Sequence, residues 1–323
     1  MLALVRRRPK QLAIAALIVV LAIVPFLGNA YYTSVLIIIG INAMVAVGLC
    51  LLMGYTGQVS LGHAAFYGLG AYISAVLSRT YHVNPWLAML AAVVATTAFA
   101  FAVGFPIFRL RGNYLAMATL GLGIILWILF REVDSITGGP SGLSGVPYLS
   151  IAGFNFSSDF RFYYLVWGFC IAIMVISESI VASRMGRAMR AVHGSESAAQ
   201  SLGVNAAVVK VKVLALSAAY AAVAGSLFTY YLTFVSPQPF DFLFSVQLVV
   251  MAVVGGLASI WGAVFGAGAI RVLSEVLHPF GELDVVVFGL LLMVVMILTP
   301  QGLVRGIADL WHRFVSVRLA PTR

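Results

Sequence analysis

About ten apolar stretches, each long enough for a membrane-crossing helix, follow one another along this chain with polar segments between them. A helix needs about 20 mostly apolar residues to cross the hydrocarbon core of a bilayer. No water is present there to satisfy an unpaired backbone amide, so each crossing segment has to pair its amides within its own helix. The sequence therefore predicts an all-α, polytopic membrane protein. The expected spans are 11–28, 31–53, 59–78, 85–107, 113–130, 162–182, 213–235, 242–257, 260–277 and 284–299.

Charged residues are too few to cover a soluble domain. They make up 9% of the 323 residues, and 62% of the chain is hydrophobic, whereas about 25% charged residues are usual in soluble proteins. We expect residues 1–323 to form a single transmembrane domain. The basic and then apolar N-terminus also resembles a secretory signal peptide, but its apolar run, 12–27, is long for one.

The basic residues indicate how the spans are oriented. Cytoplasmic loops of membrane proteins collect Lys and Arg. With ten spans and a cytoplasmic N-terminus, most of the 19 Lys and Arg residues fall on the cytoplasmic side. Only Gly255, Gly256 and the stretch 258–261 separate the eighth and ninth spans. Merging these spans would place the basic C-terminal tail outside, so ten spans with both termini in the cytoplasm are preferred.

The segment 183–212 is a long polar island between two apolar spans, on the expected cytoplasmic side. Its sequence is SRMGRAMRAVHGSESAAQSLGVNAAVVKVK, and its middle is rich in Ala, Ser and Gly. A chain that only turns back needs a handful of residues, so an island with its own helical pattern favours contact with another protein. Its charged residues are Arg184, Arg187, Arg190, Glu196, Lys210 and Lys212.

The segment 131–161 is the second long polar segment, and the same topology places it outside. It contains TGGPSGLSGVP, whose Gly and Pro residues are typical of turns. Its acidic residues are Glu132, Asp134 and Asp159. Two interpretations remain open: a solvated outer surface, or a surface for docking or substrate access.

The segment 54–72, GYTGQVSLGHAAFYGLGAY, is too rich in Gly and polar residues for an ordinary span. Gln58, Ser60 and His63 are costly in lipid unless they face protein or water. Broken helices of this kind often line transport sites near the middle of the membrane. The alternative is a tight helix-packing seam. His63 is expected to be a hydrogen-bonded interior residue rather than a proton relay.

Arg271 and Glu275 are four residues apart in the ninth expected span. This spacing puts both side chains on one helix face, where they can form an ion pair. Charges within membrane spans face protein or a cavity and are functional candidates. An ion pair that only fixes helix packing is the competing interpretation.

Several chemistries find no support in the sequence. It contains no GxxxxGK[ST] phosphate loop and no metal-ligand spacing, and no cofactor is indicated. Cys50 and Cys170 fall within apolar runs and are expected to be small buried side chains. A membrane-embedded enzyme would have only His63 and Glu275 as candidate residues. An importer with this sequence would have to draw its energy from a partner protein.

Six segments together carry a family resemblance, and they extend over nearly the whole chain. They are 54–72, RLRGNYLAMATLGLG (109–123), TGGPSGLSGVP (137–147), MGRAMRAVHGSESAAQSLGVN (185–205), VVGGLASIWGAVFGA (253–267) and PQGL (300–303). In this order and spacing, the chain resembles the LivM-type permease subunits of bacterial branched-chain amino acid ABC importers. The resemblance implies an importer permease fold in the bacterial inner membrane.

The resemblance also implies partners. These are a second, related permease subunit, two cytoplasmic ATPases, a periplasmic or extracellular substrate-binding protein, an amino acid substrate and membrane lipid. The island 183–212 then corresponds to the loop that couples ATP hydrolysis to transport. Its expected coupling residues are Arg187 and Arg190 together with Glu196, Ala198, Ala199 and Gly203, which match the pattern E-x-A-A-x-x-x-G. A small-residue face on this helix would fit a groove on the ATPase, so a charge at Ala199 is expected to abolish uptake.

Three positions depart from the family pattern, and the first two bear on the substrate. The chain has Asn113 where the family often has Asp, Ile124 where it often has an acid, and Ala258 where Gly is common. We expect Gln58, Ser60, His63 and Asn113 to line the translocation pathway. Because lost acids change pathway polarity, a permease for urea or short amides remains an alternative substrate assignment. A stand-alone secondary transporter remains an alternative from another class.

Overall fold

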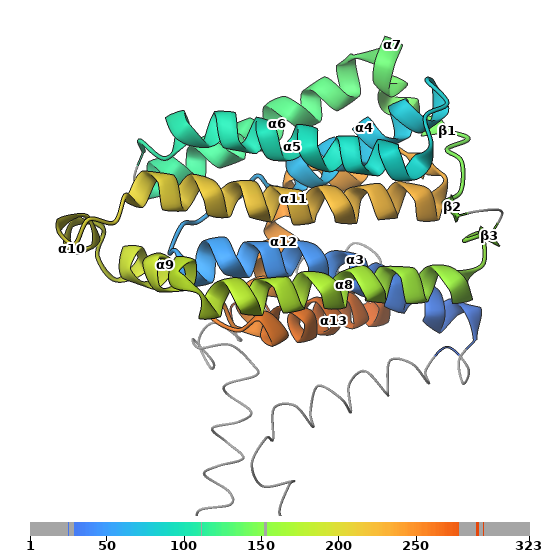
Figure 1. The fold of residues 1–323 in the computed structure, drawn as a ribbon. Helices are drawn as coiled ribbons and strands as arrows, with labels where there is room; N and C mark the ends of the chain where they lie inside the picture. The colour runs from blue at the N-terminus through green and yellow to red at the C-terminus, as the bar shows by residue number, and fades with distance from the viewer. Residues whose placement is uncertain are drawn as a thin grey trace, which may run out of the picture.

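The computed structural model describes residues 29–110, 112–151 and 154–277, together with positions 25, 289, 290 and 293. The described chain is mostly helical (Figure 1). Its main helices are α3 (Ala30–Leu49), α4 (His63–Arg79), α5 (Pro85–Ile107), α6 (Asn113–Glu132), α8 (Asp159–Ala182), α11 (Ala206–Leu232), α12 (Phe242–Gly255) and α13 (Ile260–Leu277). A π-helical turn, η1 (Cys50–Tyr55), continues α3.

Six of these helices are long and apolar enough to cross a membrane, among the residues described. They are Ala30–Tyr55, which joins α3 and η1, and α5, α6, α8, α11 and α13. The predicted all-helical, multi-pass character is confirmed at this level. The first and last predicted spans, 11–28 and 284–299, lie outside the continuously described ranges.

Short elements gather at the two ends of the bundle (Figure 1). One end carries α9 (Arg184–Gly194) and α10 (Glu196–Ser201), and we call it the α10 end. The opposite end, called the α7 end, carries α7 (Asp134–Thr137) and the strands. The remaining short elements are η2 (Gly139–Ser141), η3 (Gln238–Phe240), β1 (Leu143–Ser144), β2 (Ser150–Ile151), β3 (Phe154–Asn155) and β4 (Phe234–Val235).

The strands tie the loops of the α7 end together. β1 pairs antiparallel with β4, with Leu143 opposite Val235 and Ser144 opposite Phe234. β2 pairs with β3 as a separate antiparallel ladder. The predicted outer segment 131–161 is therefore a folded structure that is anchored to the chain following α11.

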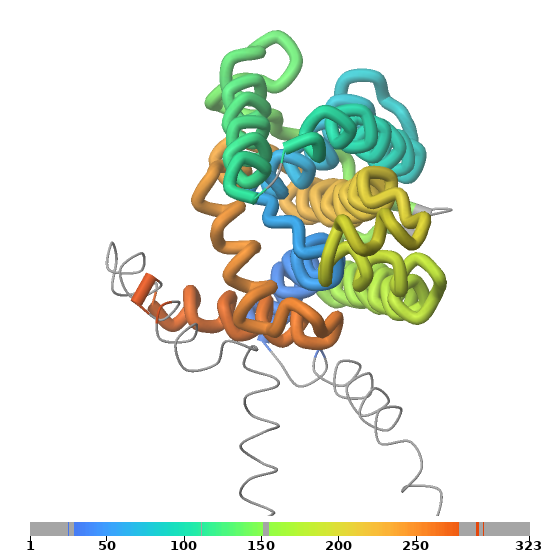
Figure 2. The backbone as a smooth tube through the Cα atoms, turned by 90° about the vertical axis from the view of Figure 1, so that its left-hand side faces the viewer, coloured from blue at the N-terminus to red at the C-terminus, as the bar shows by residue number. Residues whose placement is uncertain are grey.

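The core is built around α3 and α11. α11 packs against α3, α4 and α5, and α3 packs against α8, α12 and α13 as well. Figure 2 views the bundle from the α10 end and shows α12 crossing the other helix axes at a steep angle. α6 lies at the edge of the bundle and is the least buried of the candidate spans.

α12 and α13 are separate helices joined by the turn 256–259. α12 is shorter than the candidate membrane spans, so its crossing of the membrane stays a prediction. The two helices approach very closely, because a Cβ added at Gly255 would lie 2.0 Å from the carbonyl oxygen of Gly262. The turn itself, 256–259, rests on η1. The Leu257 carbonyl accepts a hydrogen bond from Cys50 Sγ (2.8 Å), and the Ala258 carbonyl accepts one from Tyr55 Oη (2.9 Å).

Several helix boundaries differ from the predicted spans. α4 begins at His63 rather than at 59, because the preceding polar residues stay irregular. α11 begins at Ala206 rather than at 213. The Asn205 side chain caps its first turn by accepting a hydrogen bond from the Val208 N–H. α12 ends at Gly255 and is about 21 Å long at 1.5 Å per residue, shorter than the membrane core of about 30 Å.

Candidate functional site

A polar break, residues 56–62, separates η1 from α4 inside the bundle. Gly57 has a φ of +70°, a left-handed conformation that favours glycine. The Gly57 and Gln58 N–H groups donate to the carbonyls of Met53 and Leu52, both at 3.1 Å. The Gln58 side chain donates to the Thr56 carbonyl at 2.9 Å. The break thus satisfies much of its polar backbone locally, as irregular backbone inside a membrane has to.

The break is also fixed to the neighbouring helix α6. The Leu61 N–H donates to Thr119 Oγ1 at 3.1 Å. A Cβ added at Gly62 would lie 2.2 Å from the Thr119 carbonyl oxygen, so the two backbones are in direct contact. One hydrogen bond and direct backbone contact therefore hold the break against the first half of α6.

His63 forms a buried polar cluster with Ser60 of the break and Ser217 of α11. The His63 side chain is fully buried. Its Nδ1 lies 2.9 Å from Ser60 Oγ, and its Nε2 lies 2.7 Å from Ser217 Oγ on α11. Both ring nitrogens therefore have hydroxyl partners, and this arrangement is that of a hydrogen-bonded interior residue.

We expect His63→Leu to destabilise the protein without specifically blocking transport. The substitution leaves the Ser60 and Ser217 hydroxyls without their partner, and each buried unsatisfied group costs about 1–3 kcal/mol. Thermal unfolding in detergent measures the change. The triple variant Ser60→Ala/His63→Leu/Ser217→Ala removes all three polar groups and is expected to recover much of the loss. Normal stability but abolished transport in His63→Leu would contradict this structural role.

A cavity of about 440 Å³ lies at the α10 end, between the break, α6 and the end of α9. It is lined by residues 56–59 of the break, by 112, 113, 115 and 116 at the start of α6, and by 192–196. Two of the predicted pathway residues, Gln58 and Asn113, meet in this cavity. Ser60 and His63 are not among its lining residues, so the structure divides the four predicted residues into two groups.

The α9 helix packs an apolar face on the bundle and ends over the break. Gly186, Met189 and Val192 form its buried face. A Cβ added at Gly57 would lie 3.4 Å from the ring of His193. The end of α9 therefore rests directly on the residue where the break turns.

The two predicted coupling arginines on α9 contact the preceding helix end. Arg187 Nη1 lies 3.5 Å from the Ser183 carbonyl oxygen, and Arg190 Nη1 lies 3.3 Å from that of Val181. Basic side chains at a helix C-terminus satisfy carbonyls that have no partner within the helix and complement its dipole. Arg190 therefore holds α9 against the end of α8, whereas Arg187 contacts the N-cap residue of its own helix, whose carbonyl also accepts from the Arg187 N–H.

The α10 helix has well-formed ends. The Ser195 hydroxyl caps its start by accepting from the Ala198 N–H at 3.3 Å. At its other end Gly203 has a φ of +82°. The Val204 N–H donates to the Ala199 carbonyl (3.0 Å) and the Gly203 N–H to the Gln200 carbonyl (2.9 Å), which is a Schellman motif. A helix of only six residues depends on such caps.

The faces of α10 differ from the small-residue surface expected from the sequence. Ala199 is buried against the rest of the chain, because α10 packs back on α9 and α11. Ala198 is exposed, and the neighbouring Leu202 is 83% exposed. The surface that α10 offers to another protein therefore includes Ala198 and Leu202, while Ala199 fixes the helix in place.

Glu196 forms an ion pair with Lys210, a contact that sequence reasoning missed. Lys210 Nζ donates to Glu196 Oε1. The Lys210 side chain is 3% exposed and that of Glu196 is 29% exposed. In the sequence, Lys210 is one of the charged residues of the polar island, 183–212; in the structure it is a buried residue of α11 and anchors α10. The Glu196–Lys210 pair could not be predicted, because no local sequence pattern indicates a contact between residues 14 positions apart. The exposed Leu202 could have been noticed, because it is a large apolar residue within the polar island.

Arg271 and Glu275 pair on α13, at the α7 end of the bundle. Arg271 Nη2 lies 3.1 Å from Glu275 Oε2, and Tyr31 at the start of α3 donates a hydrogen bond to Glu275. Both charged side chains are partly exposed. This geometry makes the pair a link between the first and last continuously described helices.

Six candidate membrane spans, packed around a polar break, define a multi-pass membrane protein. In the part of the chain that the structure describes, no three His, Cys, Asp or Glu side chains are grouped to hold a metal ion.

Comparison with known proteins identifies the family. The family described as "Branched-chain amino acid transport system / permease component" matches residues 31–299, and the chain belongs to it. The LivM permease proteins of high-affinity branched-chain amino acid transport systems in Salmonella typhimurium and Escherichia coli K12 are each 32% identical. Each alignment covers 91% of this chain and 75% of the relative. The LivH permease protein of Escherichia coli K12 is 28% identical, over 81% of this chain and 90% of its own length.

No solved structure matches the chain at a significant level. The family consists of transport components, and the chain is not itself an enzyme.

Proposed function

We propose that this chain is one permease subunit of an ATP-driven importer for branched-chain or related neutral amino acids. The family match over residues 31–299 carries the proposal. Residues 1–323 would form one transmembrane domain of about ten helices with an ABC importer permease fold. The partners would be two cytoplasmic ATPases, a second related permease subunit and a substrate-binding protein outside the membrane.

The α10 end is assigned to the cytoplasm. It carries Arg109 together with the basic residues of the polar island, 183–212, whereas Glu132, Asp134 and Asp159 lie at the α7 end. This distribution follows the positive-inside rule. In a bacterial inner membrane the segment 131–161 would then face the substrate-binding protein, and both termini would be cytoplasmic.

The polar island is proposed to couple ATP hydrolysis to transport through two contacts. α10 is joined to α11 by the Glu196–Lys210 pair, and the end of α9 lies on Gly57 of the break. An ATPase that moves α10 would therefore move α11 and the break together. The cavity that contains Gln58 and Asn113 lies between these elements, so its shape would change with the position of α10.

Leu202 is the residue that best tests this coupling role. Its side chain is 83% exposed at the tip of the cytoplasmic loop, and apolar anchors in a partner's pocket often dominate binding. In the complete transporter, reconstituted with its partners, we expect Leu202→Asp to lower ATPase co-purification and ATP-driven uptake at least about tenfold, a loss of about 1.4 kcal/mol or more. Membrane insertion of the variant should be unchanged.

Tyr81→Asp provides the matched control, because it introduces the same charge at an exposed aromatic residue in the α4–α5 turn at the α7 end. It should retain the ATPases. If Leu202→Asp also retained the ATPases and full uptake, the coupling role of α10 would be rejected. Ion-gradient transport by the purified chain alone would instead favour the secondary-transporter alternative. ATP-driven uptake of urea or short amides in preference to leucine would favour the other substrate class.

A further inference from the structure

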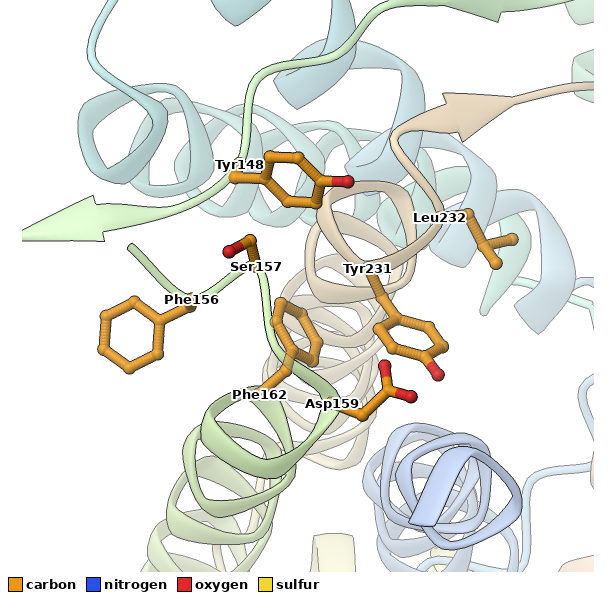
Figure 3. Close-up of a pocket in the computed structure, with 7 residues that line it drawn as sticks. All are labelled: Tyr148, Phe156, Ser157, Asp159, Phe162, Tyr231 and Leu232. Atoms are coloured by element: carbon orange, nitrogen blue, oxygen red, sulfur yellow. The ribbon is translucent and has the colours of Figure 1, made fainter. Parts of the chain in front are cut away.

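A second cavity, of about 280 Å³, lies at the α7 end (Figure 3). Its walls come from the segment before β2, the start of α8 and the end of α11. In the close-up, the Tyr148 ring lies on one side, and the Asp159 carboxylate and Tyr231 hydroxyl lie together on the opposite side. Cavities that bind small molecules are usually about 300–1,000 Å³, so this one suits only a compact ligand.

Asp159 places a carboxylate in this cavity. Ser34 Oγ on α3 lies 3.3 Å from Asp159 Oδ2, and the Ala30 carbonyl oxygen, 3.0 Å away, is the other acceptor for the same hydroxyl. Across the described ranges, no basic side chain forms an ion pair with Asp159. The nearby Arg161 donates to the Asn155 carbonyl instead, at 3.0 Å. Tyr231 is a further hydrogen-bonding partner of the carboxylate, but a hydroxyl does not neutralise its negative charge, which can therefore attract a cation from outside.

Aromatic rings form part of the remaining walls, together with Ser157 and Leu232. Phe162 and Tyr231 pack with their ring centroids 5.2 Å apart and their planes inclined by 35°. Tyr148 is exposed at the opposite side. Such rings contact an apolar ligand body and also attract a cation through their electron-rich faces. One carboxylate with aromatic rings and hydroxyl groups around it matches a single positive group on a small body, and it does not match a doubly charged cation.

We propose that this cavity binds a small neutral amino acid through its ammonium group, with Asp159 as the charged partner and the aromatic rings around the side chain. The choice of an amino acid among small ammonium compounds rests on the proposed function. The site would hold substrate at the outer face before the pathway opens. Neither the proposed coupling loop nor the cavity at the α10 end contributes to it.

Ligand binding to the purified transporter, in lipid nanodiscs and without its binding protein, tests this site. Saturation-transfer NMR would measure leucine binding, with isopentylamine and 4-methylpentanoate as competitors that keep only the ammonium or only the carboxylate. We expect the amine to displace leucine and the acid to leave it bound. Because charge-assisted hydrogen bonds are the strong ones, Asp159→Asn should weaken leucine binding at least about tenfold.

Glu132→Gln serves as the control, since it removes one negative charge from an exposed residue of the same outer segment. It should bind leucine as the unmodified protein does. Unchanged leucine binding in Asp159→Asn, or displacement by the acid as effective as by the amine, would overturn the proposed site.

ATP-driven uptake in proteoliposomes, with the binding protein added, separates this inference from the proposed function. If leucine uptake is normal but the nanodisc sample binds no leucine, the site is wrong and the importer function stands. If Asp159→Asn weakens only the affinity for the binding protein, the cavity is a docking site for that protein, and our proposal is wrong. If the transporter shows no ATP-driven amino acid uptake at all, the proposed function itself fails.

Discussion

Replacing Glu196 by alanine is expected to release α10 from the bundle. The variant leaves the Lys210 ammonium inside the protein without its partner. Removing one member of a buried ion pair costs about 3–5 kcal/mol, and the lower figure applies because Glu196 is partly exposed. A cost of about 3 kcal/mol corresponds to at least a hundredfold larger population of the released loop. Limited proteolysis of the segment 195–205 would measure this increase.

Two further variants identify the ion pair as the cause. Glu196→Ala/Lys210→Met removes both charges, and its protease resistance should return most of the way, since apolar replacements of buried pairs are often neutral. Glu132→Ala is the control, because it breaks an exposed ion pair in which Arg131 Nε and Glu132 Oε1 are 3.8 Å apart. Exposed pairs contribute about 0–1 kcal/mol to stability. Protease resistance of Glu196→Ala equal to that of the unmodified chain would show that the pair does not hold α10.

Replacing Gly54 by alanine is expected to disrupt the packing of the α12–α13 turn on η1. The added Cβ would lie 1.4 Å from the Leu257 carbonyl oxygen, which is backbone and cannot rotate away. Overpacking a core commonly costs about 1–3 kcal/mol, and an overlap with backbone should reach or exceed the upper figure. The Cys50 and Tyr55 contacts to the same turn would be lost as well. Thermal unfolding and gel filtration in detergent would report the loss.

Gly121→Ala is the matched control for this overlap. Gly121 is also within a helix, but a Cβ added there meets no atom within 4 Å. The substitution should leave stability unchanged or raise it by up to about 1 kcal/mol, because alanine is the better helix former. A Gly54→Ala variant as stable as Gly121→Ala would mean that the turn 256–259 does not rest on η1.

The long spans could be predicted from the sequence because the length of an apolar run is enough to identify them. A run of about 20 apolar residues has no stable place other than a membrane helix, and the starts and ends of α5 and α13 coincide with the predicted limits. The start of α11 was missed because its first turns contain Lys210 and Lys212. These two charges lower the local hydropathy, so the segment resembles a loop. Only a tertiary partner, Glu196, explains how the first of these lysines enters a buried helix face.

The candidate site was predictable in composition but not in arrangement. The polar residues of 54–72 indicated a break, and the break is present. Which of them share a cavity depends on side-chain direction after an irregular turn, which no periodic pattern describes. Ala199 was predicted to be a coupling residue on a small-residue face of α10, because small residues suit a docking groove as well as tight packing. In the structure Ala199 is buried where α10 contacts α9 and α11, and its coupling role stays a prediction.

Tyr31 and Glu275 are in contact, although they lie near the beginning and the end of the continuously described chain. In topological terms, the helices between them therefore form a ring that is open at a single point. For the described helices α3 to α13, a circular permutation that joins these two ends and opens the chain at the α4–α5 turn (80–84) would keep their contacts with one another and change only their order in the chain. The packing of these helices, unlike their insertion into the membrane, is then independent of which helix comes first.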